Sequence, residues 1–293
     1  MSSATRLRNL LAQPGKTTLA AGVYDGITAR LALREGFECL YMTGAGTAAS
    51  CLGMPDLGIT NLSDMVQNAG MIASLDRTVP VIADADTGYG ESLMVARTVR
   101  AYMAAGVAGM HLEDKGQAKN KELVEEDVYL NRIKAAVAAR DELRATTGMD
   151  IVIIARTDSL ESLGYDAAVA RLKNAVKAGG EMAFLEGFTS VEQCERLCAD
   201  LAPIPVLVNN ITGGKTPDLS IDEANRMGFK VVIFPSAALS VVYEAATIMY
   251  RQLKSTGRQY ITEDRKKQGS KAFYEAMGLQ ECVDFDLKLG GTK

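Results

Sequence analysis

Residues 80–86 read PVIADAD, a short apolar run that ends abruptly in two carboxylates. Val81, Ile82 and Ala83 have the character of a buried strand, and residues two apart in a strand point to the same face. Asp84 and Asp86 are therefore predicted to project from one face where this strand ends. A buried strand that directs two negative charges at one point indicates a site for chemistry or binding.

Seven further apolar runs of this kind occur along the chain, with helix-like periodicity between them. They lie at 18–25, 38–44, 107–114, 151–158, 181–187, 204–210 and 230–236. Parallel strands need crossover connections, and eight strand–helix units in about 240 residues fit a closed (β/α)₈ TIM barrel. An open doubly wound sheet is the alternative. It is disfavoured because the runs are about equally apolar and no glycine-rich dinucleotide motif opens the first helix.

The composition favours one large domain. Apolar residues make up 47% of the 293 residues, and the net charge is −4 with both signs spread along the chain. No composition break divides residues 1–293, and we expect 256–293 to form a helical extension that covers the barrel or reaches a neighbouring subunit. No block of Lys and Arg forms a basic face, so we predict no nucleic-acid partner.

The sequence also predicts a cytoplasmic location. No run approaches about 18 consecutive apolar residues, so no membrane span is expected. Residues 1–16 lack the apolar core of a signal peptide. The odd set of cysteines matches no zinc pattern, and free thiols fit a reducing compartment. They are Cys39, Cys51, Cys194, Cys198 and Cys282.

In such a barrel the chemistry lies at the C-terminal ends of the strands. The eight runs end, in order, in Asp25, Thr43–Gly46, Asp84 with Asp86, His111 with Glu113 and Asp114, Arg156 with Asp158, Glu186, Asn209 with Asn210, and Ser236. Several carboxylates that share one space need a cation, and oxygen ligands favour Mg²⁺, with Mn²⁺ next. The alternative, which stays open, is that these carboxylates cap loops or pair with Arg and Lys. Arg156 either clamps a substrate carboxylate or forms a structural ion pair with Asp158 or Glu186.

Taken together, longer strings at the strand ends resemble a known family. They are YMTGAGTAASCLGMPDLGITNLSDM at 41–65, VIADADTGYG at 81–90, GMHLEDK at 109–115, IIARTDS at 153–159, FLEG at 184–187 and NNITGGKTP at 209–217. In this order they resemble the isocitrate lyase / phosphoenolpyruvate mutase superfamily, over residues 5–255. The likeness is to the short-chain branch that includes 2-methylisocitrate lyase, oxaloacetate hydrolase and dimethylmalate lyase.

The resemblance implies a barrel with a Mg²⁺ site, an α-oxo or α-hydroxy carboxylate substrate, and a homotetramer in which the eighth helix swaps between neighbours. It implies that Asp86 is the direct metal ligand and that Asp56, Asp84 and Glu113 hold the metal's waters. Thr43, Gly44 and Ala45 match the turn that binds the substrate, and Arg156 matches the carboxylate clamp. The further pocket residues that it implies are Tyr41, Glu186, Asn210 and His111.

One segment departs from the family pattern. The lyase branch carries K-[KR]-C-G-H after the fourth strand, whereas residues 111–129 here read HLEDKGQAKNKELVEEDVY, without a cysteine. The phosphonate branch carries E-D-K-x-x-x-K-x-N-S, of which Glu113, Asp114, Lys115 and Lys119 match the first part. The acid or base is thus left open among Tyr41, Lys115, Lys119, Glu186 and a metal-bound water.

Three functions remain as hypotheses. The first is a Mg²⁺-dependent lyase or hydrolase that cleaves a C–C bond of a small oxo- or hydroxy-dicarboxylate of the oxaloacetate, methylisocitrate or alkylmalate type, through an enolate. The second is phosphonopyruvate or phosphoenolpyruvate chemistry. The third is a diverged protein that binds carboxylates without cleaving them.

Overall fold

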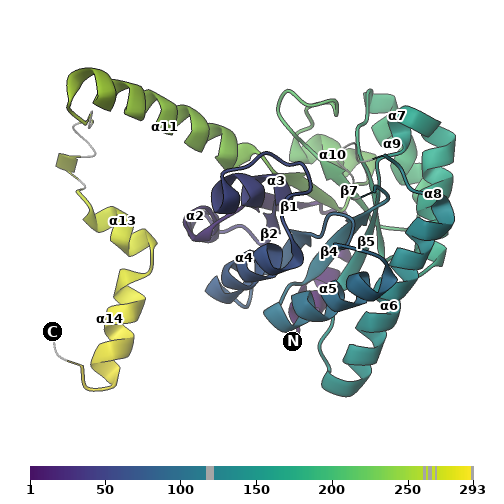
Figure 1. The fold of residues 1–293 in the computed structure, drawn as a ribbon, viewed down its shortest axis with the longest axis horizontal. Helices are drawn as coiled ribbons and strands as arrows, with labels where there is room; N and C mark the ends of the chain where they lie inside the picture. The colour runs from purple at the N-terminus through teal and green to yellow at the C-terminus, as the bar shows by residue number, and fades with distance from the viewer. Residues whose placement is uncertain (117–121, 260–261, 263–265, 268, 292–293) are drawn as a thin grey trace.

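The computed structural model describes residues 1–116, 122–259, 262, 266–267 and 269–291. Its centre is a closed barrel of eight parallel strands in sequence order, in which β8 pairs with β1 (Figure 1). The strands are β1 Thr18–Val23, β2 Cys39–Met42, β3 Val81–Asp84, β4 Gly109–Glu113, β5 Val152–Thr157, β6 Met182–Leu185, β7 Val206–Asn209 and β8 Val231–Phe234. Each lies within one of the predicted runs, and the TIM barrel is confirmed.

Helices surround the barrel and fill most connections between strands. They are α1 Ser3–Leu11, α2 Gly26–Arg34, α3 Gly44–Thr47, the π-helical turn η1 Ala48–Leu52, α4 Leu62–Leu75, α5 Ser92–Ala105, α6 Glu126–Thr147, α7 Leu160–Leu163, α8 Tyr165–Lys177, α9 Val191–Leu201, α10 Ile221–Met227 and α11 Ala237–Thr256. Asp25, at the end of the first run, caps α2 by accepting from the Thr28 backbone N–H. Asp25 thus has the structural capping role that was the alternative to metal binding for the strand-end carboxylates.

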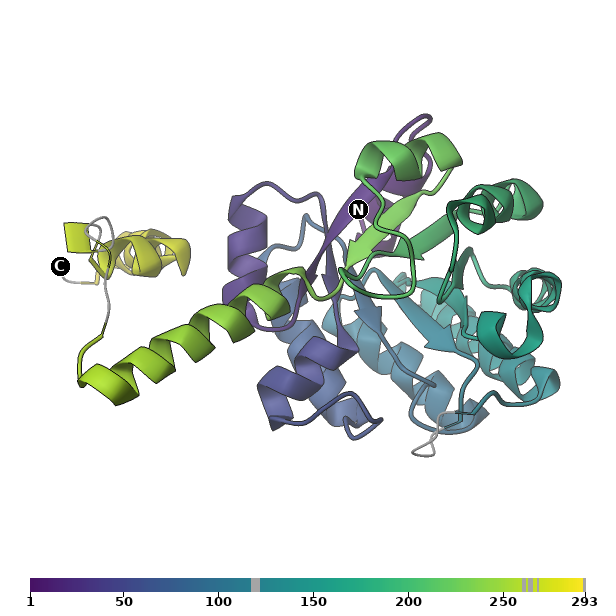
Figure 2. The same ribbon diagram turned by 90° about the horizontal axis from the view of Figure 1, so that it is seen from above.

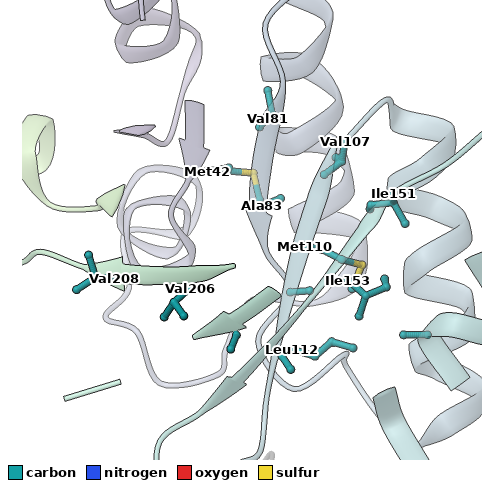
Figure 3. Close-up of a cluster of buried hydrophobic side chains, with 14 of the residues drawn as sticks. Met42, Val81, Ala83, Val107, Met110, Leu112, Ile151, Ile153, Val206 and Val208 are labelled. Carbon is teal, nitrogen blue, oxygen red and sulfur yellow. The ribbon is translucent and has the colours of Figure 1, made fainter. Parts of the chain in front are cut away.

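Alternation along each strand divides the interior into two layers. In β2, Leu40 and Met42 pack outward against the helices, whereas Cys39 and Tyr41 point to the barrel axis. Figure 3 shows part of the outer layer, including Met42, Val81, Ala83, Met110 and Ile153. The inner layer includes Ile82, Ile154, Phe184, Leu207 and Ile233, with Leu7 of α1 packed against it. The barrel is thus a filled core, and only its polar end is available for chemistry.

The register of the strands aligns their polar ends. Asp84 pairs across the sheet with His111, and Glu113 pairs with Arg156. The strand that carries Asp84 ends there, however, so Asp86 lies two residues beyond it, with a left-handed φ of 48°. The expectation that Asp84 and Asp86 share one face of a strand is therefore wrong, because a loop conformation, and not the pleat, sets the direction of Asp86.

The C-terminal part leaves the barrel. α11 projects away from it (Figure 2) and has no buried residue. Helices α13 (Lys271–Ala276) and α14 (Leu279–Lys288) follow, and Arg30 of α2 pairs with Glu281 at 3.2 Å. Both helices lie within residues 256–293, the range over which the sequence predicts a helical extension. Among the described residues, no helix combines the length and the apolar character needed to cross a membrane.

Candidate active site

An aromatic layer closes the floor of the barrel mouth. The Tyr41 hydroxyl and His111 Nε2 are 2.8 Å apart, and their rings are stacked with centroids 5.8 Å apart. The His111 ring also meets the Phe184 ring edge-on at 5.5 Å. All three side chains come from inward-facing strand positions and are buried. The polar groups above them therefore rest on a buried, closely packed base.

The polar members of this floor are both uncharged. Burial, reinforced by Arg156, lowers the pKa of His111 to about 3. Burial and the neighbouring Asp84 raise the pKa of Tyr41 well above its usual value. Near neutral pH, Tyr41 therefore keeps its proton and His111 is a neutral imidazole. The pair can exchange hydrogen bonds with a ligand but adds no charge to the mouth.

Asp84 is held by backbone groups on two sides. Gly44 N–H donates to its Oδ2 at 3.2 Å, and Asp86 N–H donates to its Oδ1 at 2.8 Å. The Tyr102 hydroxyl also donates to the Asp84 carbonyl oxygen at 2.7 Å. A Cβ on Gly44 would collide with the Asp84 carboxylate, so glycine is required for this close approach. This approach places the Thr43–Ala45 turn directly beside Asp84.

Arg156 lies at the centre of the charged groups. Its Nε and Nη2 donate to the two carboxylate oxygens of Asp158 at 2.8 and 3.1 Å. Glu113 and Glu186 lie 3.5 and 3.6 Å away, and the guanidinium carbon is 5.0 Å from the centre of the Phe184 ring. Burial opposes its charge, but the three carboxylates raise its pKa above the usual value. The ion pair with Asp158 is therefore present, and Nη1 is the group that does not bond to Asp158.

Asp158 joins Arg156 to a second cation. Lys115 Nζ lies 2.8 Å from Asp158 Oδ2. Burial opposes ionisation of Asp158, yet Arg156 and Lys115 lower its pKa below the usual range. Lys115, Asp158 and Glu186 line a cavity of about 780 Å³ at the mouth, whose outer wall includes Tyr165 and Lys215. This cavity has ample room for a small organic acid beside the charged groups.

Glu186 is oriented by Asn209, a strand-end residue that the resemblance did not place in the pocket. Asn209 Nδ2 donates to Glu186 Oε2 at 3.0 Å from the end of β7. The predicted pocket residue Asn210 instead donates to the Leu219 carbonyl oxygen at 2.7 Å, which ties down the loop before α10. Parity explains the difference, because Asn209 continues the inward positions of β7 and Asn210 does not. Asn209 lies two residues after the inward-facing Leu207, and this two-residue spacing could have identified Asn209 from the sequence.

The donor set of the mouth suits a hard cation. Its carboxylates, Asp84, Asp86, Glu113, Asp158 and Glu186, outnumber the nearby cations Arg156 and Lys115 by three. Among the described residues, no three His, Cys, Asp or Glu side chains are grouped as a complete metal site. One or two carboxylates plus water is the coordination that Mg²⁺ commonly accepts. Asp56 lies on an exposed loop, and Lys119 falls outside the described residues.

With its charged groups gathered at the C-terminal ends of the strands, the chain has the layout of a TIM-barrel enzyme. The family model of phosphoenolpyruvate phosphomutase matches residues 7–254, and the chain belongs to that family. This match confirms the superfamily to which the strand-end strings pointed.

Curated relatives and solved structures resemble the chain over most of its length. A 2,3-dimethylmalate lyase of Eubacterium barkeri is 36% identical over 292 residues, which cover 98% of each chain. A 2-methylisocitrate lyase of Escherichia coli (strain K12) is 36% identical over 266 residues, covering 85% of this chain and 87% of the relative. The structure of oxaloacetate acetylhydrolase with the product oxalate is 45% identical, covers 99% of both chains and has a TM-score of 0.94. The chain is accordingly an enzyme of this superfamily.

Proposed function

We propose that the protein is a Mg²⁺-dependent lyase or hydrolase that cleaves a C–C bond of a small 2-oxo- or 2-hydroxy-dicarboxylate. The observation that carries the proposal is the excess of carboxylates around Arg156 at the polar end of the barrel. Relatives named for 2,3-dimethylmalate and oxaloacetate match this chain from end to end, which favours substrates of those two types.

The metal would be held through Asp86 directly, with Asp84, Glu113 and Asp56 binding its waters. All of these are oxygen donors, and Asp84 already has a fixed orientation. Mg²⁺, or Mn²⁺ in its place, supplies positive charge that stabilises an enolate oxygen as the bond breaks.

The protein's own groups would bind and orient the substrate. The Thr43, Gly44 and Ala45 turn, whose Gly44 N–H lies 3.2 Å from Asp84 Oδ2, and the Arg156 guanidinium would together bind a substrate carboxylate. Tyr41, uncharged and supported by His111, donates a hydrogen bond to a substrate oxygen. Asn210 acts on the same substrate through the loop that it anchors.

Cleavage needs one base and one acid. We assign the base to Glu186, whose carboxylate is held by Asn209 and faces Arg156; it takes the proton of the substrate hydroxyl or of a water. In a 2-hydroxy acid the deprotonated hydroxyl oxygen becomes a carbonyl oxygen as the adjacent C–C bond breaks; in a 2-oxo acid the oxygen of the water first adds to the oxo carbon, and the adjacent C–C bond then breaks. In both cases the electron pair of that bond enters the enolate. Lys115 is the described ammonium group in this cavity nearest to the buried carboxylates, and it returns a proton to the enolate carbon.

A substrate panel tests the proposal. Purified protein is incubated with oxaloacetate, 2,3-dimethylmalate and 2-methylisocitrate, with Mg²⁺, with Mn²⁺ and with EDTA. We expect turnover of at least one acid that EDTA abolishes and added Mg²⁺ restores. Absence of metal-dependent turnover on all three, together with calorimetric binding of oxalate, would replace the proposal by the carboxylate-binding hypothesis.

Phosphonate chemistry is the second candidate, favoured by Glu113-Asp114-Lys115 and by the family to which the chain belongs. The Asp114 side chain, however, is buried against Arg171. It therefore supports the fold at this position, and the motif argues less strongly for phosphonates. A ³¹P NMR spectrum of phosphonopyruvate that stays unchanged during incubation with the enzyme removes this candidate.

We also propose that the enzyme is a cytoplasmic homotetramer in which α11 packs on neighbouring subunits. α11 exposes apolar side chains on a helix with no buried residue; they include Val241, Val242, Tyr243, Ile248 and Tyr250. The five cysteines form no disulfide, as a reducing compartment requires. Sedimentation equilibrium tests the assembly, and a monomer at micromolar concentration would contradict it.

A further inference from the structure

We propose that Arg132 and Arg171, two arginines on outer helices, are positioning residues that hold Lys115 and Asp158 in place at the mouth. The inference rests on the proposed function for the roles of Lys115 and Asp158. Neither arginine lies at a strand end, and neither lines the cavity beside Glu186. Both act through the chain segments that leave β4 and β5.

Arg132 holds the start of the segment that follows β4. From α6, its Nη1 donates to the Lys115 carbonyl oxygen at 2.7 Å. Its carboxylate partner is Glu91, 3.4 Å away on a side chain that is 80% exposed. A guanidinium that is only 3% exposed therefore has a weak ionic partner and a strong main-chain acceptor.

Arg171 holds the other end of the same segment. From α8, its Nη2 donates to the Val124 carbonyl oxygen at 3.0 Å, and its Nε donates to Asp114 Oδ2 at 2.9 Å. Tyr129 of α6 lies beneath the guanidinium, 5.7 Å from its ring centre. The Arg171 guanidinium thus links the Val124 carbonyl oxygen to Asp114, the residue that follows β4.

Asp114 transmits this restraint to Asp158. The carboxylate is fully buried; it accepts from the Thr157 hydroxyl at 2.5 Å and from the Asp158 N–H at 3.0 Å. The backbone at Asp158 is thereby fixed at the point from which its side chain reaches Arg156 and Lys115. The chain from Arg171 to the reacting groups contains only two links, Asp114 and Asp158.

The two clamped ends are also paired with each other. Gly116 N–H donates to the Glu122 carbonyl oxygen at 2.8 Å, Val124 N–H donates to the Asp114 carbonyl oxygen at 2.9 Å, and Lys115 bridges to Leu123. Lys115 therefore sits on a short two-stranded stem, and one arginine binds each of its two strands.

The energetics support a positioning role. Burying a guanidinium is costly unless charge and hydrogen bonds compensate it, and a neutral carbonyl oxygen compensates it less than a carboxylate does. Arg132, whose carboxylate partner Glu91 is exposed, is therefore hard to explain by stability alone, whereas the charge of Arg171 is compensated by the buried Asp114. A displacement of about 1 Å at reacting groups can lower a rate about 100-fold, which gives such positioning a functional purpose.

The test compares Arg132→Met and Arg171→Met with Arg140→Met as a matched control. Arg140 lies two turns after Arg132 on α6, is similarly buried, and pairs with Glu181 and Asp141 instead of with the stem. We expect kcat to fall at least 10-fold in the first two variants, with KM changed less than about 3-fold. Arg132→Met should lose no more thermal stability than the control, whereas Arg171→Met should lose more, because it leaves the buried Asp114 without its ionic partner. The kcat of the control should stay near wild type.

Lysine replacements give a signature that a purely structural role would not produce. Arg132→Lys should recover kcat, because one ammonium can still reach one carbonyl oxygen. Arg171→Lys should not recover kcat, because an ammonium group lacks the planar arrangement of donors that reaches Asp114 and the Val124 carbonyl oxygen together. If both lysine variants recover equally, or if kcat falls only in proportion to stability, the proposal is overturned.

Hydrogen exchange separates this proposal from the proposed reaction. The Gly116 and Val124 amides should exchange faster in Arg132→Met and Arg171→Met, but at the wild-type rate in Arg140→Met. Unchanged exchange refutes the clamp whatever the activity. If the wild type turns over none of the dicarboxylates, the proposed function fails while the exchange experiment still decides the positioning.

Discussion

Arg156 and Asp158, two residues apart, face each other through two hydrogen bonds of 2.8 and 3.1 Å across the end of β5. The carboxylate also holds Lys115, so a single aspartate fixes both cations of the mouth. Asp158 restrains Nε and Nη2 of Arg156, while Nη1 lies 3.5 Å from Glu113 Oε2, and a guanidinium held in a fixed orientation favours recognition of a carboxylate.

Replacing Asp158 by Asn should release both cations with little change in shape. We expect kcat/KM to fall at least 10-fold, and the free energy of unfolding to fall by about 1–3 kcal/mol, because a buried ion pair loses one partner while Glu113 and Glu186 still face Arg156. Asp166→Asn, which breaks an exposed pair with Arg196, is the control and should cost less than about 1 kcal/mol. Equal effects of the two variants in urea unfolding would contradict this picture.

His111 should make stability depend on pH. It is the only histidine, and its pKa of about 3 in the folded state lies below the ordinary 6.5. Below pH 6.5, His111 becomes protonated in the unfolded chain but stays neutral in the folded protein. The contribution of His111 to the free energy of unfolding is therefore fully present above pH 6.5 and is lost as the pH falls. Between pH 7.5 and 5.5 the metal-free wild type should lose about 1.4 kcal/mol.

His111→Gln provides the comparison for this pH effect. Urea unfolding in EDTA should show a flatter profile for the variant between pH 7.5 and 5.5. Parallel profiles for the two proteins would mean that His111 is not the responsible group.

Gly44→Ala should disturb the site more than the fold. The added Cβ displaces the Asp84 carboxylate, so we expect a loss of activity of at least 10-fold with a small change in melting temperature. Gly26→Ala, where the new methyl meets only the Met71 side chain at ordinary contact distance, should keep full activity. A fully active Gly44→Ala variant would show that Asp84 need not be held in this position.

Asp86→Gly should lose activity but be more stable than Asp86→Ala. A non-glycine residue at a φ of +48° carries backbone strain that glycine relieves. Asp86→Ala also removes the carboxylate but keeps the strain, so the glycine variant should be more stable than the alanine variant by about 1 kcal/mol. Chemical denaturation measures this difference, and an alanine variant that is equally stable would argue against strain at this turn.

Asn209 should affect the reaction through Glu186. Asn209→Ala removes the donor to that carboxylate, and we expect kcat to fall about 10-fold with a small change in KM. Asn210→Ala removes the donor to the Leu219 carbonyl oxygen, so it should mainly lower the melting temperature. The opposite pattern in steady-state kinetics would assign Glu186 to a passive role.

The sequence predicted the barrel well because each strand is marked twice, by an apolar run and by the polar residue that ends it. Asp84, Glu113 and Arg156, which the sequence places at the ends of successive apolar runs, lie at the ends of neighbouring strands, because register carries over directly to space. The position of Asp86 was missed because a left-handed turn depends on tertiary contacts, which a two-residue spacing does not contain.

Arg132 and Arg171 were beyond the reach of sequence reasoning for a different reason. A charged residue within a helical repeat has the same pattern whether it is solvated or buried, and most such residues are solvated. Only the packed structure shows that these two side chains turn inward, Arg132 onto the Lys115 carbonyl oxygen and Arg171 onto the Val124 carbonyl oxygen and Asp114.

Phe184 has a further consequence. The Phe184 ring belongs to the inner core. It also contacts two polar groups, the Arg156 guanidinium and the His111 imidazole. Hydrophobic packing and substrate recognition therefore depend on the same atoms at this position. A substitution chosen only to make the interior more heat-resistant would also change the electrostatic environment of the guanidinium, so thermal robustness and selectivity cannot be improved independently here.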